Sequence, residues 1–225
     1  VGLFTRSVAD MARWSGAIAG HAWQPAQRQP VFGIAWDWPW EPLSPSARLA
    51  LETARRTLEA AGATVREVGL PAWLGTVFKA HDAVQGWEAA RALADEFDFH
   101  REQLSPILRD YLVQARTVGD AAYEQGQAEA ALGRSRLHEL FDGIDVLLCP
   151  SAPDEAPQGF GSTGASTWNR AWTLLHVPCL NVPGAVGVTG LPMGVQVIAP
   201  LRGEAACLQA GALLEAALAK ALPPG

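Results

Sequence analysis

The residues that most often carry chemistry in proteins are few in this chain and stand far apart. It has five histidines (His21, His81, His100, His138 and His176) and three cysteines (Cys149, Cys179 and Cys207). None forms an H-E-x-x-H or C-x-x-C pattern, the spacings typical of metal ligands. We therefore expect no metal site, and we interpret the cysteines as reduced, buried thiols of a cytoplasmic protein.

The candidate nucleophiles have poor partners in the sequence. Cys179 follows His176 by three residues in a strand-like run, where positions i and i+3 point to opposite faces. Ser162 stands in FGSTG, in which a phenylalanine replaces the first glycine of a nucleophile elbow. The two lysines, Lys79 and Lys220, are expected to stay solvated on helices rather than to act as a base beside a serine. We expect no catalytic residue in this chain.

Composition narrows the remaining classes of ligand. Gly159, Gly161 and Gly164 match G-x-G-x-x-G, but in a loop well past its strand and with the next acidic residue only at Glu204, so we expect no dinucleotide and no other cofactor. The net charge is -6 without a cluster of Lys or Arg, which argues against nucleic acid. No apolar run approaches the ~20 residues of a membrane span, so we expect no membrane partner.

The elements that must position any site follow an α/β pattern. A helix is expected from Ser7 to Gly20, a strand-helix-strand unit over about 31–69, and a helical insertion over about 72–141. The apolar run 144–150 predicts a strand covered on both faces, and the Pro- and Gly-rich stretch 151–167 a long loop. A short helix (168–175), two strands within 177–200 and a last helix to about 220 complete a mixed β-sheet flanked by helices.

Several of these segments occur in the order typical of one enzyme family. RSVAD before a helix, then FGIAWD, LETARRTLEAAGATVREVGLP, FDGIDVLLCPSAP and VPCLNVPGAVGVTGLPMGVQVIAP together resemble the amidase signature family of hydrolases. The resemblance covers essentially the whole chain, and GLPMGVQVIAP is its most specific part. It implies an α/β/α fold and hydrolysis of a carbon–nitrogen amide bond other than a peptide bond.

In that family a serine is the nucleophile, a second serine in a cis peptide relays its proton to a lysine, and backbone N–H groups of a glycine-rich loop hold the oxyanion. All of these precede the RSVAD segment, and this chain starts at Val1. The resemblance thus implies the C-terminal portion of a single amidase domain, residues 1–225, which would be inactive alone. Its partners would be the missing N-terminal half and a small-molecule amide, and a homodimer would be compatible with it.

The resemblance also suggests which residues meet the substrate. Trp168, Asn169 and Trp172 lie where that family builds a wall of its substrate funnel, although two tryptophans at helical spacing are equally typical of a core. Gln196 is an amide in an otherwise apolar strand, so it must find buried partners. We predict partners in the missing half; the alternative is backbone within this chain.

Two other classes of protein remain open. One is a non-catalytic α/β binding or interaction module, and the other is a small enzyme that uses its own Cys179 or Ser162. A portion cut through a shared sheet should also expose an apolar strand edge or face beside residues 177–200.

Overall fold

The computed structural model describes residues 2–221, which form a five-stranded sheet with helices on both faces. The elements in chain order are α1 (Val8–Ala19), β1 (Phe32–Ile34), α2 (Pro45–Ala60), β2 (Val65–Glu67), α3 (Trp73–Ala92), α4 (Ala94–Phe99), η1 (Arg101–Gln103), α5 (Pro106–Ala115), α6 (Asp120–Ser135), α7 (Leu137–Leu140), β3 (Val146–Pro150), α8 (Thr167–Leu175), β4 (Cys179–Val186), β5 (Pro192–Ile198) and α9 (Glu204–Ala221). Within this part of the chain, no helix is long and apolar enough to cross a membrane.

The sheet has the strand order β2-β1-β3-β5-β4 and is mixed. β1 is parallel to both β2 and β3, whereas β5 is antiparallel to β3 and to β4. The prediction of a mixed α/β fold is confirmed, and so is the parallel pairing of the first strand-helix-strand unit. β3 is buried along its whole length, as expected for a strand covered on both faces.

Local signals place the helix ends where the sequence indicated. The hydroxyl of Ser7 accepts a hydrogen bond from the Asp10 amide at 3.1 Å, and Ser44 caps α2 in the same way, with Pro45 in its first turn. Ser105 caps α5, again followed by a proline. An N-cap oxygen satisfies one of the amides that the first helical turn leaves unpaired, so these starts need no tertiary contact.

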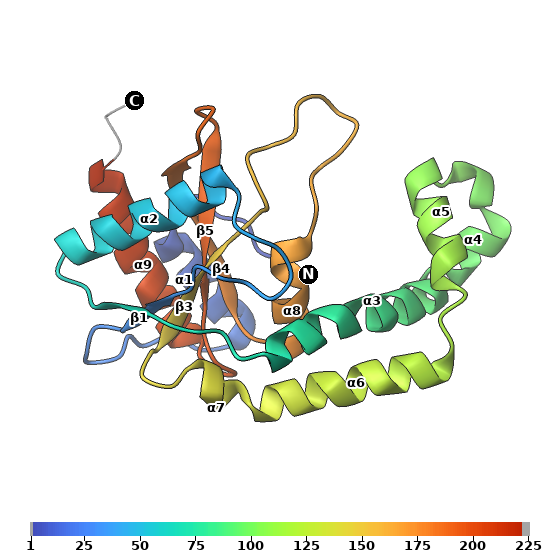
Figure 1. Cartoon of the computed structure of the whole chain (residues 1–225), viewed down its shortest axis with the longest axis horizontal. Coiled ribbons are helices and arrows are strands. Elements are labelled where there is room, and N and C mark those ends of the chain that lie inside the picture. Colours follow the sequence, from blue (N-terminus) through green and yellow to red (C-terminus); the bar gives the residue numbers. More distant parts are fainter. Residues whose placement is uncertain (1, 222–225) are drawn as a thin grey trace.

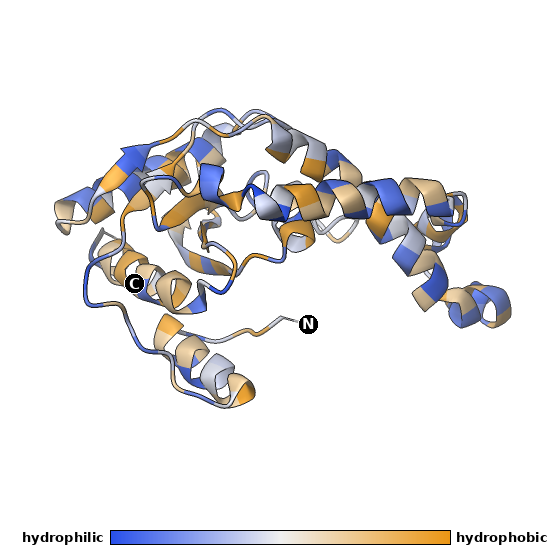
Figure 2. Ribbon diagram, turned by 90° about the horizontal axis from the view of Figure 1, so that it is seen from below, coloured by the Kyte–Doolittle hydropathy of each residue, from blue (hydrophilic) through white to orange (hydrophobic). Residues whose placement is uncertain are grey.

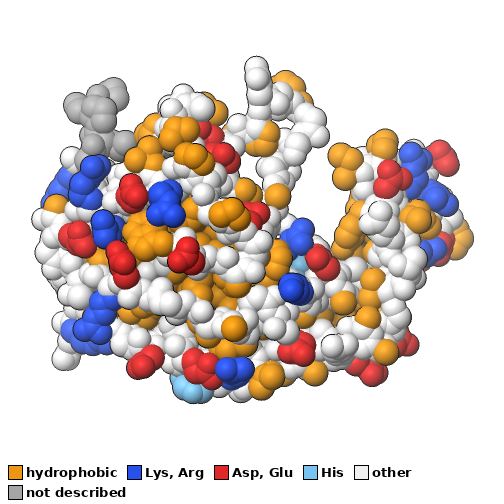
Figure 3. Space-filling model, viewed as in Figure 1, with side chains coloured by type: hydrophobic (Ala, Val, Ile, Leu, Met, Phe, Trp, Pro, Cys, Tyr) orange, Lys and Arg blue, Asp and Glu red, His pale blue; other side chains and the backbone are white. Residues whose placement is uncertain are grey.

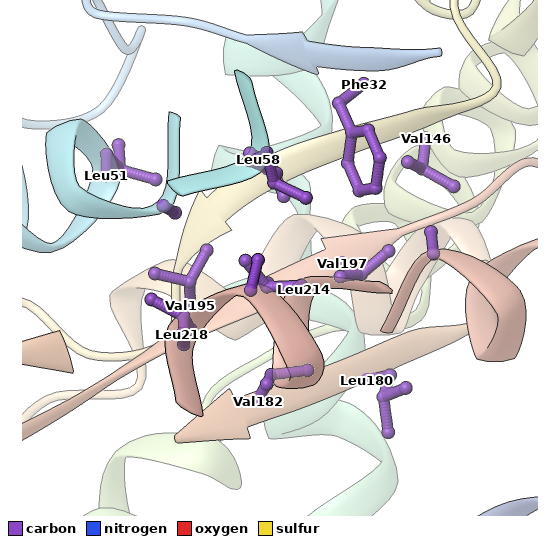
Figure 4. Packing of buried hydrophobic residues seen from close by; sticks show 14 of the residues in the cluster. Phe32, Leu51, Leu58, Val146, Leu180, Val182, Val195, Val197, Leu214 and Leu218 are labelled. Carbon is purple, nitrogen blue, oxygen red and sulfur yellow. The ribbon is translucent and has the colours of Figure 1, made fainter. Parts of the chain in front are cut away.

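Each face of the sheet has its own core. On one face α1, α2 and α9 cover the side chains of β1, β3, β4 and β5, among them Phe32, Val182, Val195 and Val197 (Figure 4). On the other face α3 and α8 pack with α7 on the side chains of β3 and β5. Burial of this apolar surface is the main term that stabilises the fold.

The segment 72–141 is helical as predicted and forms an arm. α3 and α6 lie side by side, with α4 and α5 at the far end, and the arm extends away from the sheet (Figures 1 and 2). Trp87 of α3 stacks on Tyr123 of α6 with ring centroids 3.9 Å apart. The additional break at Leu93, between α3 and α4, has no signal in the sequence.

Candidate functional site

The strand β4 lies at one edge of the sheet, and one of its faces is open. Leu180 and Val182 are buried in the core under α2 and α9, whereas Cys179, Asn181 and Pro183 alternate with them and are exposed. Residues directly opposite each other in an antiparallel pair share a face, and Asn181 lies opposite Gln196. The open face of β4 therefore continues the face that α8 covers at the centre of the sheet.

Gln196 is only 3% exposed and joins three elements at the border of this face. Its Nε2 donates to the carbonyl of Pro150, at the end of β3, at 3.1 Å and to the carbonyl of Trp168, in α8, at 3.3 Å. The prediction that its partners lie outside this chain is wrong for these two bonds, and the alternative, backbone within the chain, is what the structure shows. Gln196 fixes the start of α8 on the sheet.

A row of polar groups leads from Gln196 to the open face. Asn169 donates from Nδ2 to the Ser151 carbonyl at 3.3 Å, and the Ser151 hydroxyl donates to the Gly194 carbonyl at 2.8 Å. The Asn181 side chain lies against Gly194, where an added Cβ would collide with it. Hydrogen-bonding groups thus gather where the long loop begins beside the open face of β4, a place called the mouth of the site below; they come from Ser151, Asn169 and Asn181.

Two of the predicted substrate contacts belong to the core. Trp168 and Trp172 are each about 1% exposed, and Trp38 meets them edge to face with ring centroids 5.0 and 6.3 Å away. In this structure neither indole offers a surface to a ligand, which agrees with the core interpretation. Their position indicates that they hold α8 against the sheet and so orient the exposed Asn169.

The long loop, residues 151–166, is tied to the β4–β5 hairpin by one carboxylate. Glu155 accepts hydrogen bonds from the Thr189 hydroxyl at 2.7 Å and from the amide of Leu191 at 2.9 Å. Desolvation raises the pKa of Glu155, but these bonds and one from Ser46 outweigh it and leave the pKa lowered. The base of the loop is therefore fixed close to the mouth of the site.

A charged side chain of α8, Arg170, pairs with the neighbouring helix α3. Arg170 follows Asn169 and donates from Nη1 to Asp82 of α3 at 2.9 Å. His81, next to Asp82, is 8% exposed, whereas Asp82 itself is exposed. Burial, followed by the charge of Arg170, lowers the pKa of His81. Sequence spacing could not predict the pair of Arg170 and Asp82, because the two residues are 88 positions apart in the chain.

The described residues contain no activated nucleophile among the candidates. Cys149 is fully buried, and desolvation raises its pKa. The prediction of buried thiols is wrong for Cys179, which is exposed as a residue, but its sulfur lies in a partly buried contact and desolvation raises its pKa to about 12. The Ser162 hydroxyl accepts a hydrogen bond from the Gly164 amide within the exposed loop. Lys79 and Lys220 are exposed, as expected for solvated side chains. A thiol must be a thiolate and a serine needs an adjacent base, and neither condition is met here.

The predicted exposed edge is present, with a mixed composition. Val186, Val188 and Leu191 are 42%, 59% and 44% exposed on the β4–β5 hairpin, while Asn181 brings an amide to the open face. The ribbon coloured by hydropathy shows apolar and polar residues intermixed over the elements (Figure 2).

A family model described as Amidase matches residues 1–208, so this chain belongs to the amidase family. This match confirms the predicted resemblance to the amidase signature family. Amidase signature enzymes hydrolyse carbon–nitrogen bonds.

Individual relatives agree with this assignment. The chain is 27% identical to a glutamyl-tRNA(Gln) amidotransferase subunit of Thermosynechococcus vestitus (strain NIES-2133 / IAM M-273 / BP-1), over 91% of this chain and 52% of that protein. It is 29% identical to 2-amino-5-chloromuconic acid deaminase of Comamonas testosteroni, over 91% of this chain and 48% of the relative. A crystal structure of an amidase superposes with a TM-score of 0.84 at 31% identity, covering 94% of this chain and 51% of that one. The chain thus spans about half the length of the curated relatives it matches.

Proposed function

We propose that this chain is the C-terminal part of an amidase that hydrolyses a small-molecule amide through a serine acyl-enzyme. The serine would attack the amide carbonyl, a serine and lysine relay would protonate the leaving amine, and water would then release the acid. The serine, the lysine and the oxyanion-binding loop would be supplied by a segment outside this sequence.

The open face of β4 is the observation that carries this proposal. An edge strand with an uncovered face and free backbone groups is a surface on which further structure can pack. The solved amidase of similar structure has about as much chain again as the part matched here. The same face carries polar groups, and none of the candidate nucleophiles of this chain is activated.

In this proposal the chain supplies one wall of the substrate pocket. Asn169 and Asn181 would hydrogen-bond the substrate or the segment that carries the serine, because both side chains are exposed at the mouth. Gln196 would act through position, by holding β3 and the start of α8 together. Trp168 and Trp172 would keep α8 in place beneath Asn169.

The test compares amide hydrolysis by the full product of the gene with hydrolysis by residues 1–225 alone, measured as ammonia release. We expect turnover only by the full product. There, Asn169→Ala and Asn181→Ala should each lower kcat/KM roughly tenfold, the effect of one lost hydrogen bond. Gln114→Ala is the control, because this side chain is exposed on α5 in the distant arm.

Two results would contradict the proposal. Turnover by residues 1–225 alone, abolished by Cys179→Ala or Ser162→Ala, would show a self-contained enzyme. A full product that hydrolyses no amide, and in which no serine reacts with a fluorophosphonate probe, would instead favour a binding module. We also propose a cytoplasmic location, since the cysteines of the chain are free thiols.

A further inference from the structure

Three helices bring polar side chains together around Arg170. Arg170 comes from α8, His81 and Asp82 from α3, and Tyr111 from α5. The guanidinium carbon of Arg170 lies 5.7 Å from the ring centroid of Phe78, one turn before Asp82 in α3. The space-filling view shows a notch between the long loop and the arm, with basic, acidic and histidine side chains gathered at its foot (Figure 3).

Two polar atoms near Arg170, Oη of Tyr111 and Nδ1 of His81, are buried without a hydrogen-bond partner. Oε1 of Glu41 and Nε1 of Trp168 are also buried and unpaired, but Trp168 lies close enough to Glu41 to act on its carboxyl group as a hydrogen-bond donor, so these two atoms do not require a ligand. Most buried polar groups in native proteins are paired, and an unpaired one costs about 1–3 kcal/mol. The atoms of Tyr111 and His81 beside one guanidinium therefore point to a ligand that would pair them.

Arg170 itself has donors to spare. Its Nη1 donates to Asp82 at 2.9 Å and its Nε to Ser166 at 3.4 Å, and among the described residues Nη2 has no hydrogen-bond partner. The Arg170 side chain is 29% exposed, so the free donors can be reached from the notch. A guanidinium presents five N–H donors in a planar fork, and Asp82 occupies one end of it.

The charges nearby limit what the fork can bind. Asp82 balances Arg170, and Glu41 adds a carboxyl group whose pKa is raised chiefly by burial, against the effects of Trp168 and Arg170. His81 has a lowered pKa and is neutral near pH 7, so it adds no cation. A phosphate dianion would add two negative charges beside these carboxyl groups, whereas a planar carboxylate adds only one and matches the geometry of the fork.

We propose that Arg170, with the hydroxyl of Tyr111, binds a carboxylate of the substrate, so that the enzyme prefers amides bearing a second, ionised carboxyl group. This inference rests on the proposed amidase function. Asp82 is a positioning residue, because it holds Nη1 of Arg170 and leaves Nη2 without a hydrogen-bond partner among the described residues. Phe78, whose ring centroid lies 5.1 Å from that of Trp40, packs against the guanidinium and limits its movement.

The experiment measures kcat/KM of the full gene product for ω-amido acids and for the corresponding diamides, for example glutaramate and glutaramide. The diamide is the neutral isostere of the acid, so the ratio of the two values isolates recognition of the charge. Arg170→Gln should lower kcat/KM for the acids roughly 10- to 100-fold, the effect of a lost charge-assisted hydrogen bond, and leave the diamides within threefold. Arg170→Lys should retain part of the preference.

The matched control is Arg91→Gln. Like Arg170, Arg91 pairs with an aspartate of the arm, Asp120 at 2.9 Å, and lies over an aromatic ring, that of Trp87, but it is not part of the notch. Arg91→Gln should not change the ratio. Thermal unfolding of each variant establishes that the protein is folded.

The two proposals fail in different ways. A wild-type enzyme that prefers diamides, or an Arg170→Gln variant that loses both substrates equally, would overturn the carboxylate site and leave the amidase function standing. Absence of any amide hydrolysis by the full gene product would refute the amidase function. The carboxylate site would then be tested by ligand binding alone. In that case glutarate should raise the unfolding temperature of the wild type and not of Arg170→Gln, and no shift in either would overturn the site as well.

Discussion

Replacement of Gln196 by leucine tests whether the buried amide fastens α8 to the sheet. The substitution keeps the approximate volume but removes Nε2, which leaves the carbonyls of Pro150 and Trp168 without this donor. Each hydrogen bond contributes about 0.5–1.5 kcal/mol net, so the two together account for about 1–3 kcal/mol. The greater apolarity of leucine offsets part of this loss, while the buried carbonyls left without their donor add to it, so we expect a net destabilisation of about 2 kcal/mol.

The assay is equilibrium urea unfolding followed by tryptophan fluorescence, with Gln114→Leu as the control. Gln114 is exposed on α5, where the same chemical change should shift the free energy of unfolding by less than about 0.5 kcal/mol. For a domain of this size, 2 kcal/mol corresponds to a fall of about 4–8 °C in Tm. If Gln196→Leu is as stable as Gln114→Leu, the amide does not fasten α8, and the role of Gln196 in positioning Asn169 is refuted.

Gln196→Glu adds a pH dependence to the same test. A buried carboxylate facing two carbonyl oxygens should have its folded-state pKa raised above the unfolded value of about 4.3. The variant should therefore come closest to wild type below pH 4, where the carboxyl is neutral in both states. It should lose stability as pH rises from there, by about 1.4 kcal/mol per pH unit until the folded pKa is passed.

Three further outcomes are expected. In Glu155→Gln the amides of Thr189 and Leu191 should exchange hydrogen at least roughly tenfold faster, because the carboxylate that they bond is lost. Asp145, just before β3, accepts two hydrogen bonds from Arg28, and Asp145→Asn should lower the free energy of unfolding by about 1 kcal/mol at pH 7 because this carboxylate is lost. Because the pKa of Asp145 is lowered, the difference in unfolding free energy between variant and wild type should shrink below about pH 3.8 in urea titrations. If that difference does not change with pH, the ion pair with Arg28 does not stabilise the fold. Cys179→Ala should leave amide turnover within twofold, and at pH 8 this thiol should react on the order of 1000-fold more slowly than free cysteine in a chromogenic disulfide assay.

The sequence determined the elements whose causes are local. Ser44 followed by Pro45 sets the start of α2, and the apolar run that ends at Pro150 sets β3, because capping and hydrophobic periodicity act over a few residues. The same local reading identified Gln196 as an exception within an apolar strand. It also supported the family, through segments that keep their order along the chain.

The tertiary structure alone decided what these residues touch. Gln196 bonds a carbonyl 46 residues away in β3 and another 28 residues away in α8, and both partners depend on the order of strands in the sheet. Arg170 and Asp82 are 88 residues apart and meet only because α8 packs on α3. Periodicity describes which face of an element is apolar, but it does not say which elements share that face. Packing of the whole chain settles that, and with it the polar groups at the open face of β4.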